Sequence, residues 1–202
     1  MNDLVFASNN LHKINEIKNL VKSSYNIVGL IDKGIEEDIP EDHFTLEENA
    51  LQKAIFIYER YAYDCFADDT GLEIDALNGE PGVFSARYSL IGEPVYPKMD
   101  VTEGNIRKVL DKMSDQQLRT ARFRTVIALI LNGETHYFEG KVEGTITIDP
   151  RGKDGFGYDP IFLPLGYERT FAEMNLEDKN KISHRAIAVS KLVKFLNDSG
   201  HK

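Results

Sequence analysis

A long run of strand-forming residues that ends at Asn132-Gly133 constrains the fold of this chain more than any other feature of its sequence. The run extends from Arg122 to Leu131, and the residues from Thr135 to Val142 alternate as expected of a return strand. Asn-Gly between two such runs is a strong signal for a type I′ turn. The sequence therefore predicts a long β-hairpin, with a further strand at Thr145 to Ile148.

The first residues predict a different unit, in which a strand is followed by a polar turn and a helix. Leu4 to Ala7 reads as a short buried strand, and Ser8-Asn9-Asn10 reads as the turn. Strand–helix units early in the chain and a hairpin in its centre together indicate an α/β domain with a mixed sheet flanked by helices. The apolar face of this first helix consists of Ile14, Ile17, Leu20 and Val21.

Helix signals occur at three further places. Thr45-Leu46-Glu47-Glu48 has the form of a capping box and predicts a helix that runs to about Tyr63. Asn105 to Met113 predicts a second helix, and residues 183–197 predict a third. The buried stripe of the first of these helices consists of Ala50, Ala54, Ile57 and Tyr61.

Length and charge limit the classes of function. The chain has 202 residues, and we expect residues 1–202 to form a single domain with two lobes. Its net charge of −9 argues against general binding to DNA or RNA, where positive charge supplies the affinity. No apolar run approaches the roughly 20 residues that span a membrane, and no secretory signal is visible. We therefore expect a cytoplasmic location.

Asp68-Asp69 is the first candidate for chemistry, because the preceding residues, Cys65-Phe66-Ala67, read as a short strand that stops there. Active sites of α/β proteins commonly lie at such strand ends. Adjacent carboxylates repel one another, and a divalent cation would relieve the repulsion. Side chains one residue apart on a strand diverge, so one acid is expected to face a site while the other supports the loop. The alternative is a polar β-turn that uses the hydroxyl of Thr70 and the flexibility of Gly71.

Two segments supply cations that could bind phosphates. Ser8 to Lys13 places a polar turn at a helix N-terminus, where free backbone N–H groups attract anions. The alternative is an ordinary helix cap with a solvated lysine. Lys53 lies at the edge of the apolar stripe of its helix, four residues after Asn49. It either covers the core with its methylene groups or reaches into a site as a phosphate ligand.

Two segments in the last third of the chain are candidates for binding a base. The loop from Gly155 to Pro160 could stack a base on an aromatic ring and bond its edge through backbone amides or Asp159. The alternative is a loop whose aromatic residues fill the core. Arg185 projects into the apolar stripe of the last helix, in a first turn where the helix dipole disfavours a cation. Either a protein carboxylate or an anionic ligand should compensate its charge.

Six motifs in sequence cover nearly the whole chain. They are Ser-Asn-Asn-x-x-Lys at 8–13, Thr-x-x-Glu-Asn-Ala-x-x-Lys-Ala at 45–54, Phe-Ala-Asp-Asp-Thr-Gly-Leu at 66–72, Pro-Gly-Val-Phe-Ser-Ala-Arg-Tyr at 81–88, Gly-Phe-Gly-Tyr-Asp-Pro-Ile-Phe at 155–162 and Lys-Ile-Ser-His-Arg at 181–185. In order and spacing they resemble the inosine triphosphate pyrophosphatase family. The link after the fourth motif, Leu90 to Lys98, looks longer or more irregular than is usual in that family.

The resemblance implies a fold, a reaction and a cofactor. The family fold is an elongated α/β domain with two lobes and a central cleft, and the protein is usually a homodimer. The reaction is hydrolysis of ITP, dITP and XTP to the monophosphate and pyrophosphate with Mg²⁺, which removes these aberrant purine nucleotides from the nucleotide pool. The expected partner is therefore a small nucleotide rather than a nucleic acid or a membrane.

The resemblance also assigns roles to residues of this chain. Asp69 would be the catalytic proton acceptor and a metal ligand, and Lys53 would be a further catalytic residue. Glu41 lies where the family has another metal-binding acid, and Glu48 competes with it for that role. The triphosphate would be held by Ser8, Asn9, Asn10, Lys13, Lys53 and Thr70, and the base and sugar side by Phe156, Gly157, Tyr158, Asp159, Lys179, His184 and Arg185.

The predicted reaction is direct attack of water on the α-phosphorus, since no covalent nucleophile is evident. Asp69 would orient or deprotonate the water, while lysines and the metal neutralise the phosphates. One alternative is a Maf-type nucleotide pyrophosphatase with other bases, against which the Gly-Phe-Gly-Tyr-Asp and Ser-His-Arg motifs argue. Another is a binding module that keeps the pocket without hydrolysis, which the intact Asp68-Asp69 disfavours.

Overall fold

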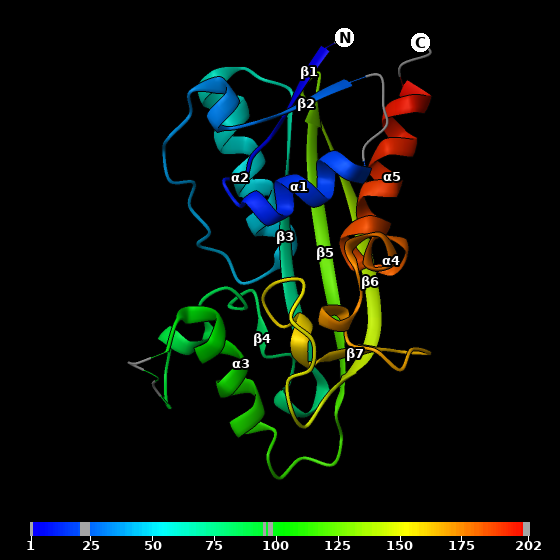
Figure 1. The fold of residues 1–202 in the computed structure, drawn as a ribbon. Coiled ribbons are helices and arrows are strands. Elements are labelled where there is room, and N and C mark those ends of the chain that lie inside the picture. Colours follow the sequence, from blue (N-terminus) through cyan, green and yellow to red (C-terminus); the bar gives the residue numbers. More distant parts are fainter. Residues whose placement is uncertain (1, 21–24, 95, 97–98, 200–202) are drawn as a thin grey trace. The chain divides into compact units, whose positions relative to one another are not determined.

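A computed structural model describes residues 2–20, 25–94, 96 and 99–199 and shows a mixed α/β fold (Figure 1). The strands are β1 (Asn2–Phe6), β2 (Tyr25–Gly29), β3 (Cys65–Ile74), β4 (Pro81–Gly82), β5 (Thr120–Leu131), β6 (Glu134–Ile146) and β7 (Phe162–Pro164). The α-helices are α1 (Leu11–Leu20), α2 (Leu46–Tyr61), α3 (Val101–Lys112), α4 (Leu176–Ile182) and α5 (His184–Ser199).

The strands form one sheet in the order β2-β1-β3-β5-β6-β7, with β4 paired to β3. β1 is parallel to β2 and to β3, whereas β4 is antiparallel to β3 and β7 is antiparallel to β6. The prediction of an α/β fold with a mixed sheet flanked by helices is therefore confirmed.

The chain divides into two compact units, each assembled from separate stretches of sequence. Unit 1 consists of residues 1–69, 125–140 and 184–202, and unit 2 of residues 70–124 and 141–183. The strands β3, β5 and β6 therefore each contribute residues to both units. The predicted elongated shape and central cleft stay predictions.

Unit 1 has a core that joins its earliest strands to its last helix. In parallel pairing Phe6 lies opposite Phe66, and their rings stack with centroids 4.8 Å apart. Cys65 is on the other face of β3, where its thiol donates to the carbonyl oxygen of Ala54 in α2 at 3.2 Å. Burial raises the pKa of Cys65 to about 12, so this thiol is unreactive. The core cluster contains Leu4, Phe6, Ile17, Phe66, Ile127, Leu129, Leu131, Ala188, Val189, Leu192 and Leu196.

Unit 2 has its own core, built on α3, on the second halves of β3 and β6 and on the first residues of β5. Three phenylalanine rings pack together there, with centroids 4.6 Å apart between Phe123 and Phe162 and 5.3 Å apart between Phe162 and Phe171. The buried residues around them include Leu72, Ile74, Val109, Met113, Ile146, Tyr158, Ile161 and Met174.

The predicted turn of the hairpin is confirmed, but its return strand is longer than predicted. Asn132 has φ 51° and Gly133 has φ 82°, the positive values that a type I′ turn requires. The return strand β6 is continuous to Ile146, so the prediction of a separate strand at Thr145 to Ile148 is wrong. The strand is continuous because residues 144–146 pair with β7, a strand that was not predicted.

β3 also continues further than predicted, because it passes through Asp68-Asp69 to Ile74. Both the strand end and the alternative polar turn at this point are therefore wrong. The second half of β3 pairs with β4, and Gly71 permits this pairing, since a Cβ there would lie 2.6 Å from the carbonyl oxygen of Gly82. Gly71 thus serves close approach of two strands rather than a turn.

The predicted helices form with shifted ends. Thr45 caps α2 by accepting from the backbone N–H of Glu48 at 3.2 Å, as predicted. α3 begins at Val101 rather than Asn105, because Asp100 accepts from the backbone N–H groups of Thr102 and Glu103. β2 and α4 were not predicted, and Tyr61 is half-buried rather than part of the buried stripe of α2.

Some predictions fall on residues outside those described. Val21 and the side chain of Leu20 are among them, as are positions 95, 97 and 98 of the 90–98 link.

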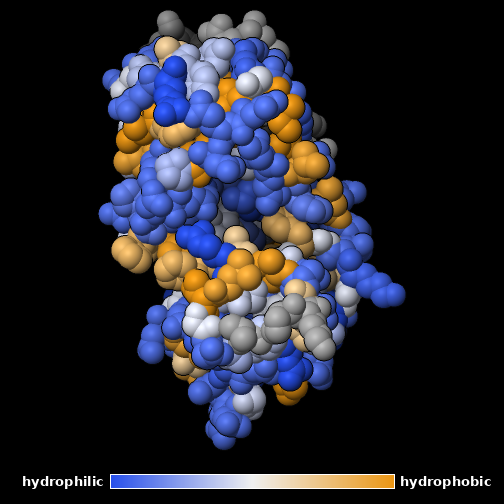
Figure 2. All heavy atoms as spheres, turned by 90° about the vertical axis from the view of Figure 1, so that its left-hand side faces the viewer, coloured by the Kyte–Doolittle hydropathy of each residue, from blue (hydrophilic) through white to orange (hydrophobic). Residues whose placement is uncertain are grey.

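None of the helices that the structure describes combines the length and apolar character needed to cross a bilayer. The face that carries α2 is mainly hydrophilic, with hydrophobic side chains in small groups (Figure 2).

Gly140 in β6 offers a test of how α5 packs on the sheet. A Cβ at this position would lie 1.9 Å from the carbonyl oxygen of His184 and 2.6 Å from the backbone nitrogen of Ala188. Gly140→Ala should therefore lower the free energy of unfolding by about 1–3 kcal/mol or more, measured by chemical denaturation. Gly29→Ala is the control, because its Cβ would meet only ordinary contacts at 3.5 Å and beyond. Equal stability of the two variants would contradict the close approach.

Candidate active site

The predicted site residues are divided between the two units. Most of the predicted metal and phosphate ligands are in unit 1, and most of the predicted base contacts are in unit 2. Unit 1 contains Ser8, Asn9, Asn10, Lys13, Glu41, Lys53, Asp69, His184 and Arg185. Unit 2 contains Thr70, Phe156, Gly157, Tyr158, Asp159 and Lys179.

The turn after β1 forms the predicted helix N-terminus. The side-chain oxygen of Asn10 accepts from the backbone N–H groups of His12 at 3.0 Å and Lys13 at 3.2 Å, so Asn10 caps α1. The hydroxyl of Ser8 accepts from the backbone N–H of Asn10 at 3.2 Å. Asn9 and Asn10 are exposed, and Lys13 turns inward. The alternative of a solvated lysine is therefore wrong.

Asp68 is enclosed by two cations. Its Oδ1 atom lies 3.0 Å from Lys13 Nζ, and its Oδ2 atom lies 3.3 Å from Arg185 Nε. The Nη1 atom of Arg185 donates to the carboxylate of Glu16. The side chains of Asp68 and Arg185 are 0% and 1% exposed, so this is a fully buried ion network.

The network explains why Arg185 can face the core. Of the two compensating groups that the sequence left open, the structure supplies protein carboxylates, from Asp68 and Glu16. Burial alone would raise the pKa of Asp68, but the charges of Lys13 and Arg185 outweigh it and lower that pKa below its usual range. Asp68 therefore remains an anion that organises the cations around it.

Asp69 points to a different set of groups. Its Oδ1 atom lies 3.5 Å from Lys53 Nζ, and the same ammonium lies 2.5 Å from Glu41 Oε1. Lys53 is 6% exposed and pairs with both acids, so it does not merely cover the core. The adjacent acids therefore diverge as predicted, with Asp68 among buried cations and Asp69 beside Glu41.

Burial makes Asp69 a better proton acceptor than an exposed aspartate. Burial raises the pKa of Asp69 although the charge of Lys53 opposes this, and the negative charge of Glu41 adds to the rise. The pKa of Lys53 is raised because Asp69 and Glu41 together outweigh the effect of its burial. A carboxylate with a raised pKa beside a firmly charged ammonium can accept a proton next to an anionic substrate.

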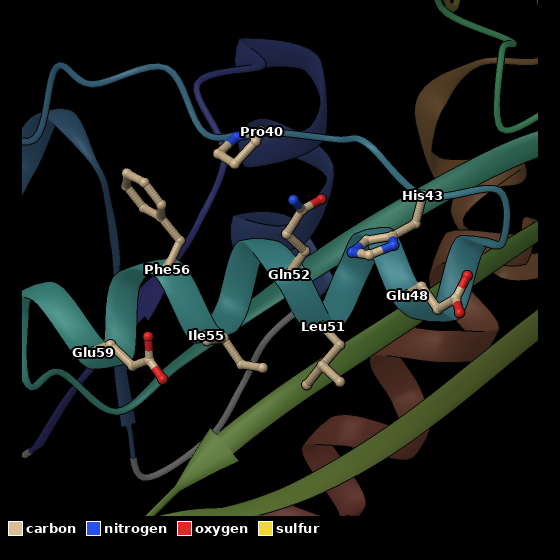
Figure 3. Close-up of a pocket in the computed structure, with 8 residues that line it drawn as sticks. All are labelled: Pro40, His43, Glu48, Leu51, Gln52, Ile55, Phe56 and Glu59. Atoms are coloured by element: carbon tan, nitrogen blue, oxygen red, sulfur yellow. The ribbon is translucent and has the colours of Figure 1, made fainter.

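Glu41 and Glu48, the two candidates for the second acid, have different surroundings. Glu48 is exposed and accepts from the hydroxyl of Thr45 at 2.8 Å. It lines a pocket of about 430 Å³ on the exposed side of α2, together with Leu51 and Ile55 (Figure 3). None of the predicted site residues lines this pocket. Glu41 instead shares Lys53 with Asp69.

In unit 2 the carboxylate of Asp159 stabilises the loop from Gly155 to Asp159. Asp159 Oδ2 accepts from the backbone N–H of Phe156 at 2.8 Å and pairs with Lys179 Nζ at 2.8 Å. A Cβ at Gly155 would lie 2.2 Å from that same oxygen, so the loop requires glycine there. Both Asp159 and Lys179 are buried, which makes this pair a support for the loop.

The aromatic residues of this loop differ in their exposure. Tyr158 is 3% exposed and donates its hydroxyl to the carbonyl oxygen of Ser85 at 2.9 Å, as a core residue does. Phe156 is only partly buried, and Lys179 Nζ lies 4.7 Å from its ring centroid. Phe156 is therefore the more exposed of the two aromatic rings of this loop.

Two remaining predicted residues lie at unit boundaries. Thr70 follows Asp69 along β3 and is half-buried. His184 is the first residue of α5 and is 3% exposed.

Two residues of the unit 1 site were not predicted as site residues. Glu16 is buried and hydrogen-bonded to Arg185. The sequence feature that could have indicated it is an acidic residue between the core positions Ile14 and Ile17 of α1. Asn49 is 1% exposed, and its amide nitrogen donates to Asp69 Oδ2 at 3.2 Å. The feature that could have indicated Asn49 is its position four residues before Lys53, on the same side of α2.

Comparisons with known proteins identify the family of this chain. The chain matches the Ham1 family model over residues 4–195. A relative from Porphyromonas gingivalis named dITP/XTP pyrophosphatase is 53% identical over 197 residues, which is 97% of this chain and 98% of the relative. A relative of the same name from Bacillus subtilis is 44% identical over 200 residues, 97% of this chain and 98% of its own length.

Solved structures show the same relationship. A Ham1 protein from Coxiella burnetii has a TM-score of 0.87 at 38% identity and covers 98% of this chain and 100% of its own. The Ham1 protein of Staphylococcus aureus has a TM-score of 0.85 at 39% identity, over 99% of this chain and 100% of its own. Together with the family match, these similarities confirm the resemblance found in the sequence, and the chain belongs to the Ham1 family.

Proposed function

We propose that this protein hydrolyses ITP, dITP and XTP to the monophosphate and pyrophosphate and so removes them from the nucleotide pool. The observation that carries the proposal is the group Glu41–Lys53–Asp69, in which two carboxylates share one buried ammonium. The names of the relatives, dITP/XTP pyrophosphatase, support the choice of substrates.

A divalent cation, Mg²⁺, fits the acids of this group. In the part of the chain that the structure describes, no three His, Cys, Asp or Glu side chains form a metal centre by themselves. Mg²⁺ is commonly held by one or two carboxylates together with substrate phosphate oxygens. Glu41 and Asp69 would supply those carboxylates, and the bound ion would neutralise charge on the phosphates.

In the reaction that we propose, water attacks the α-phosphorus and pyrophosphate leaves. A new P–O bond forms as the bond between the α-phosphorus and its bridging oxygen breaks. Asp69 orients the water and accepts its proton. Lys53 and Lys13 balance negative charge on the phosphates, and Ser8, Asn9, Asn10 and Thr70 would contribute further hydrogen bonds.

The proposed base contacts come mainly from the loop of unit 2. Phe156 would stack on the purine, and backbone amides at Gly157 and its neighbours would donate to its 6-oxo group. Asp159 and Lys179 would support that loop, which their mutual ion pair favours. Contacts from His184 and Arg185 stay predictions, since Arg185 already has two carboxylate partners.

We further propose a homodimer in the cytoplasm that acts on free nucleotides rather than on nucleic acids. The net charge of −9 supports the last point, because it opposes binding to a polyanion.

Pyrophosphate release tests the proposed function. With Mg²⁺ and equal concentrations of ITP, dITP, XTP, GTP and ATP, the first three should be hydrolysed with kcat/KM at least about 100-fold above that for ATP, because a site of donors disfavours a 6-amino group. ATP as the best substrate would refute the proposal. Preference for pyrimidine triphosphates would support the Maf-type alternative, and binding of ITP without pyrophosphate release would support the binding module.

A further inference from the structure

The amide of Asn49 joins the segment that carries Glu41 to the carboxylate of Asp69. The Oδ1 atom of Asn49 accepts from the backbone N–H of His43 at 2.9 Å. Its Nδ2 atom donates to the carbonyl oxygen of His43 at 3.3 Å and to Asp69 Oδ2 at 3.2 Å. The opposite orientation of the amide would place its oxygen against a carbonyl and a carboxylate, so the network admits only one. All three residues belong to unit 1.

Hydrogen bonds from α2 hold the segment that carries Glu41. Residues 35–43 contain neither helix nor strand, and Glu41 lies two residues before His43. Asp42, between them, exchanges two hydrogen bonds with Gln52 of α2, at 3.0 and 3.1 Å. The bonds from Gln52 are exposed, whereas Asn49 is buried and also reaches Asp69.

Asn49 also determines which oxygen of Asp69 is available. Since the amide engages Oδ2, the Oδ1 atom is the one that lies near Lys53. Two carboxylates beside one ammonium repel each other, and a neutral donor on the far oxygen of one of them restrains its rotation. Asn49 and Lys53, one helical turn apart on α2, thus hold Asp69 from two sides.

We propose that Asn49 is a positioning residue, whose amide holds the carboxylate of Asp69 and the backbone beside Glu41 in the arrangement that a divalent cation requires. This inference rests on the proposed function for its catalytic consequence. Residues that orient metal ligands typically change metal affinity or activity by 10–100-fold when replaced.

The test compares Asn49→Leu with Gln52→Leu. Both variants replace an amide of α2 that bonds the same loop, but only Asn49 touches Asp69. Asn49→Leu should lower kcat with dITP about 10–100-fold, leave KM within about threefold and raise the Mg²⁺ concentration for half-maximal rate. Gln52→Leu should keep all three quantities near wild type. Wild-type values for Asn49→Leu, equal losses in both variants, or a rise in KM alone would overturn the proposal.

Binding of Mn²⁺ alone, followed by electron paramagnetic resonance, gives a readout that does not depend on turnover. Asn49→Leu should weaken Mn²⁺ binding about 10–100-fold relative to wild type and Gln52→Leu. If the wild type binds Mn²⁺ but hydrolyses no triphosphate, the proposed function fails while this measurement still decides the role of Asn49. A wild type that binds no Mn²⁺ would overturn the inference.

Asn49→Asp covers the case in which the leucine variant does not fold. It has the same shape and keeps the acceptor for the N–H of His43, but it loses the donor to Asp69 and adds a negative charge beside it. We expect a folded protein with kcat reduced at least as much as in Asn49→Leu. Full activity of a folded Asn49→Asp variant would exclude the positioning role.

Discussion

Asp69→Asn should reduce kcat for dITP by about 100-fold or more, while the protein stays folded. Asparagine preserves the size of the side chain, but its single oxygen can face only one of the two donors, Lys53 or Asn49. It removes the negative charge, so the side chain can neither accept a proton from water nor attract a divalent cation.

The stability of this variant provides its control. Burial raises the pKa of Asp69, so its ionised form destabilises the folded state at neutral pH. Removal of this charge should offset the loss of one hydrogen-bond acceptor, so we expect a melting temperature close to that of wild type. Pyrophosphate release and thermal unfolding measured on one preparation test both expectations. A folded variant with activity near wild type would remove Asp69 from the mechanism.

Asp68→Asn should have the opposite effect on stability, although the two acids are neighbours in the sequence. The substitution leaves Lys13 and Arg185 without the carboxylate between them, and the side chains of Asp68 and Arg185 are inaccessible to water. Breaking a buried ion network by removing one charge typically costs about 3–5 kcal/mol. We expect a loss of that size in the free energy of unfolding, measured by urea denaturation at neutral pH.

Asp3→Asn is the matched control for this loss. Asp3 also pairs with a lysine from within unit 1, at 2.7 Å from Lys33 Nζ, but the Asp3 side chain is 41% exposed. Water screens such a pair, so its removal should change stability little. Similar losses in the two variants would show that burial of the Asp68 network does not matter.

The fold was predictable where short-range signals determine it. Asn132-Gly133 fixed the hairpin, and Thr45 fixed the start of α2, because each acts through its own backbone neighbours. The course of β3 was not predictable in this way. Its continuation beyond Asp69 depends on pairing with Pro81–Gly82, and nothing in the residues of β3 themselves indicates that partner.

The site shows the same limit. The motif around Asp69 and Lys53 was evident in the sequence, since charged residues beside buried runs require an explanation. The hydrogen-bond and ion-pair partners of these residues are far apart in the sequence, as Glu16 and Arg185 are. The choice between Glu41 and Glu48 was open for that reason. In the structure Glu41 pairs with Lys53, whereas Glu48 lines the pocket on the exposed side of α2.

The division of each unit into separate stretches of sequence has a consequence for synthesis. The core of unit 1 joins Leu4 and Phe6 to Leu192 and Leu196, so it cannot be completed until α5 has left the ribosome. Until then the apolar faces of β1 and β3 lack the helix that covers them, and such surfaces favour aggregation. A nascent chain arrested before residue 184 should therefore be protease-sensitive and bound by chaperones, although the acids and lysines of its site have already been made.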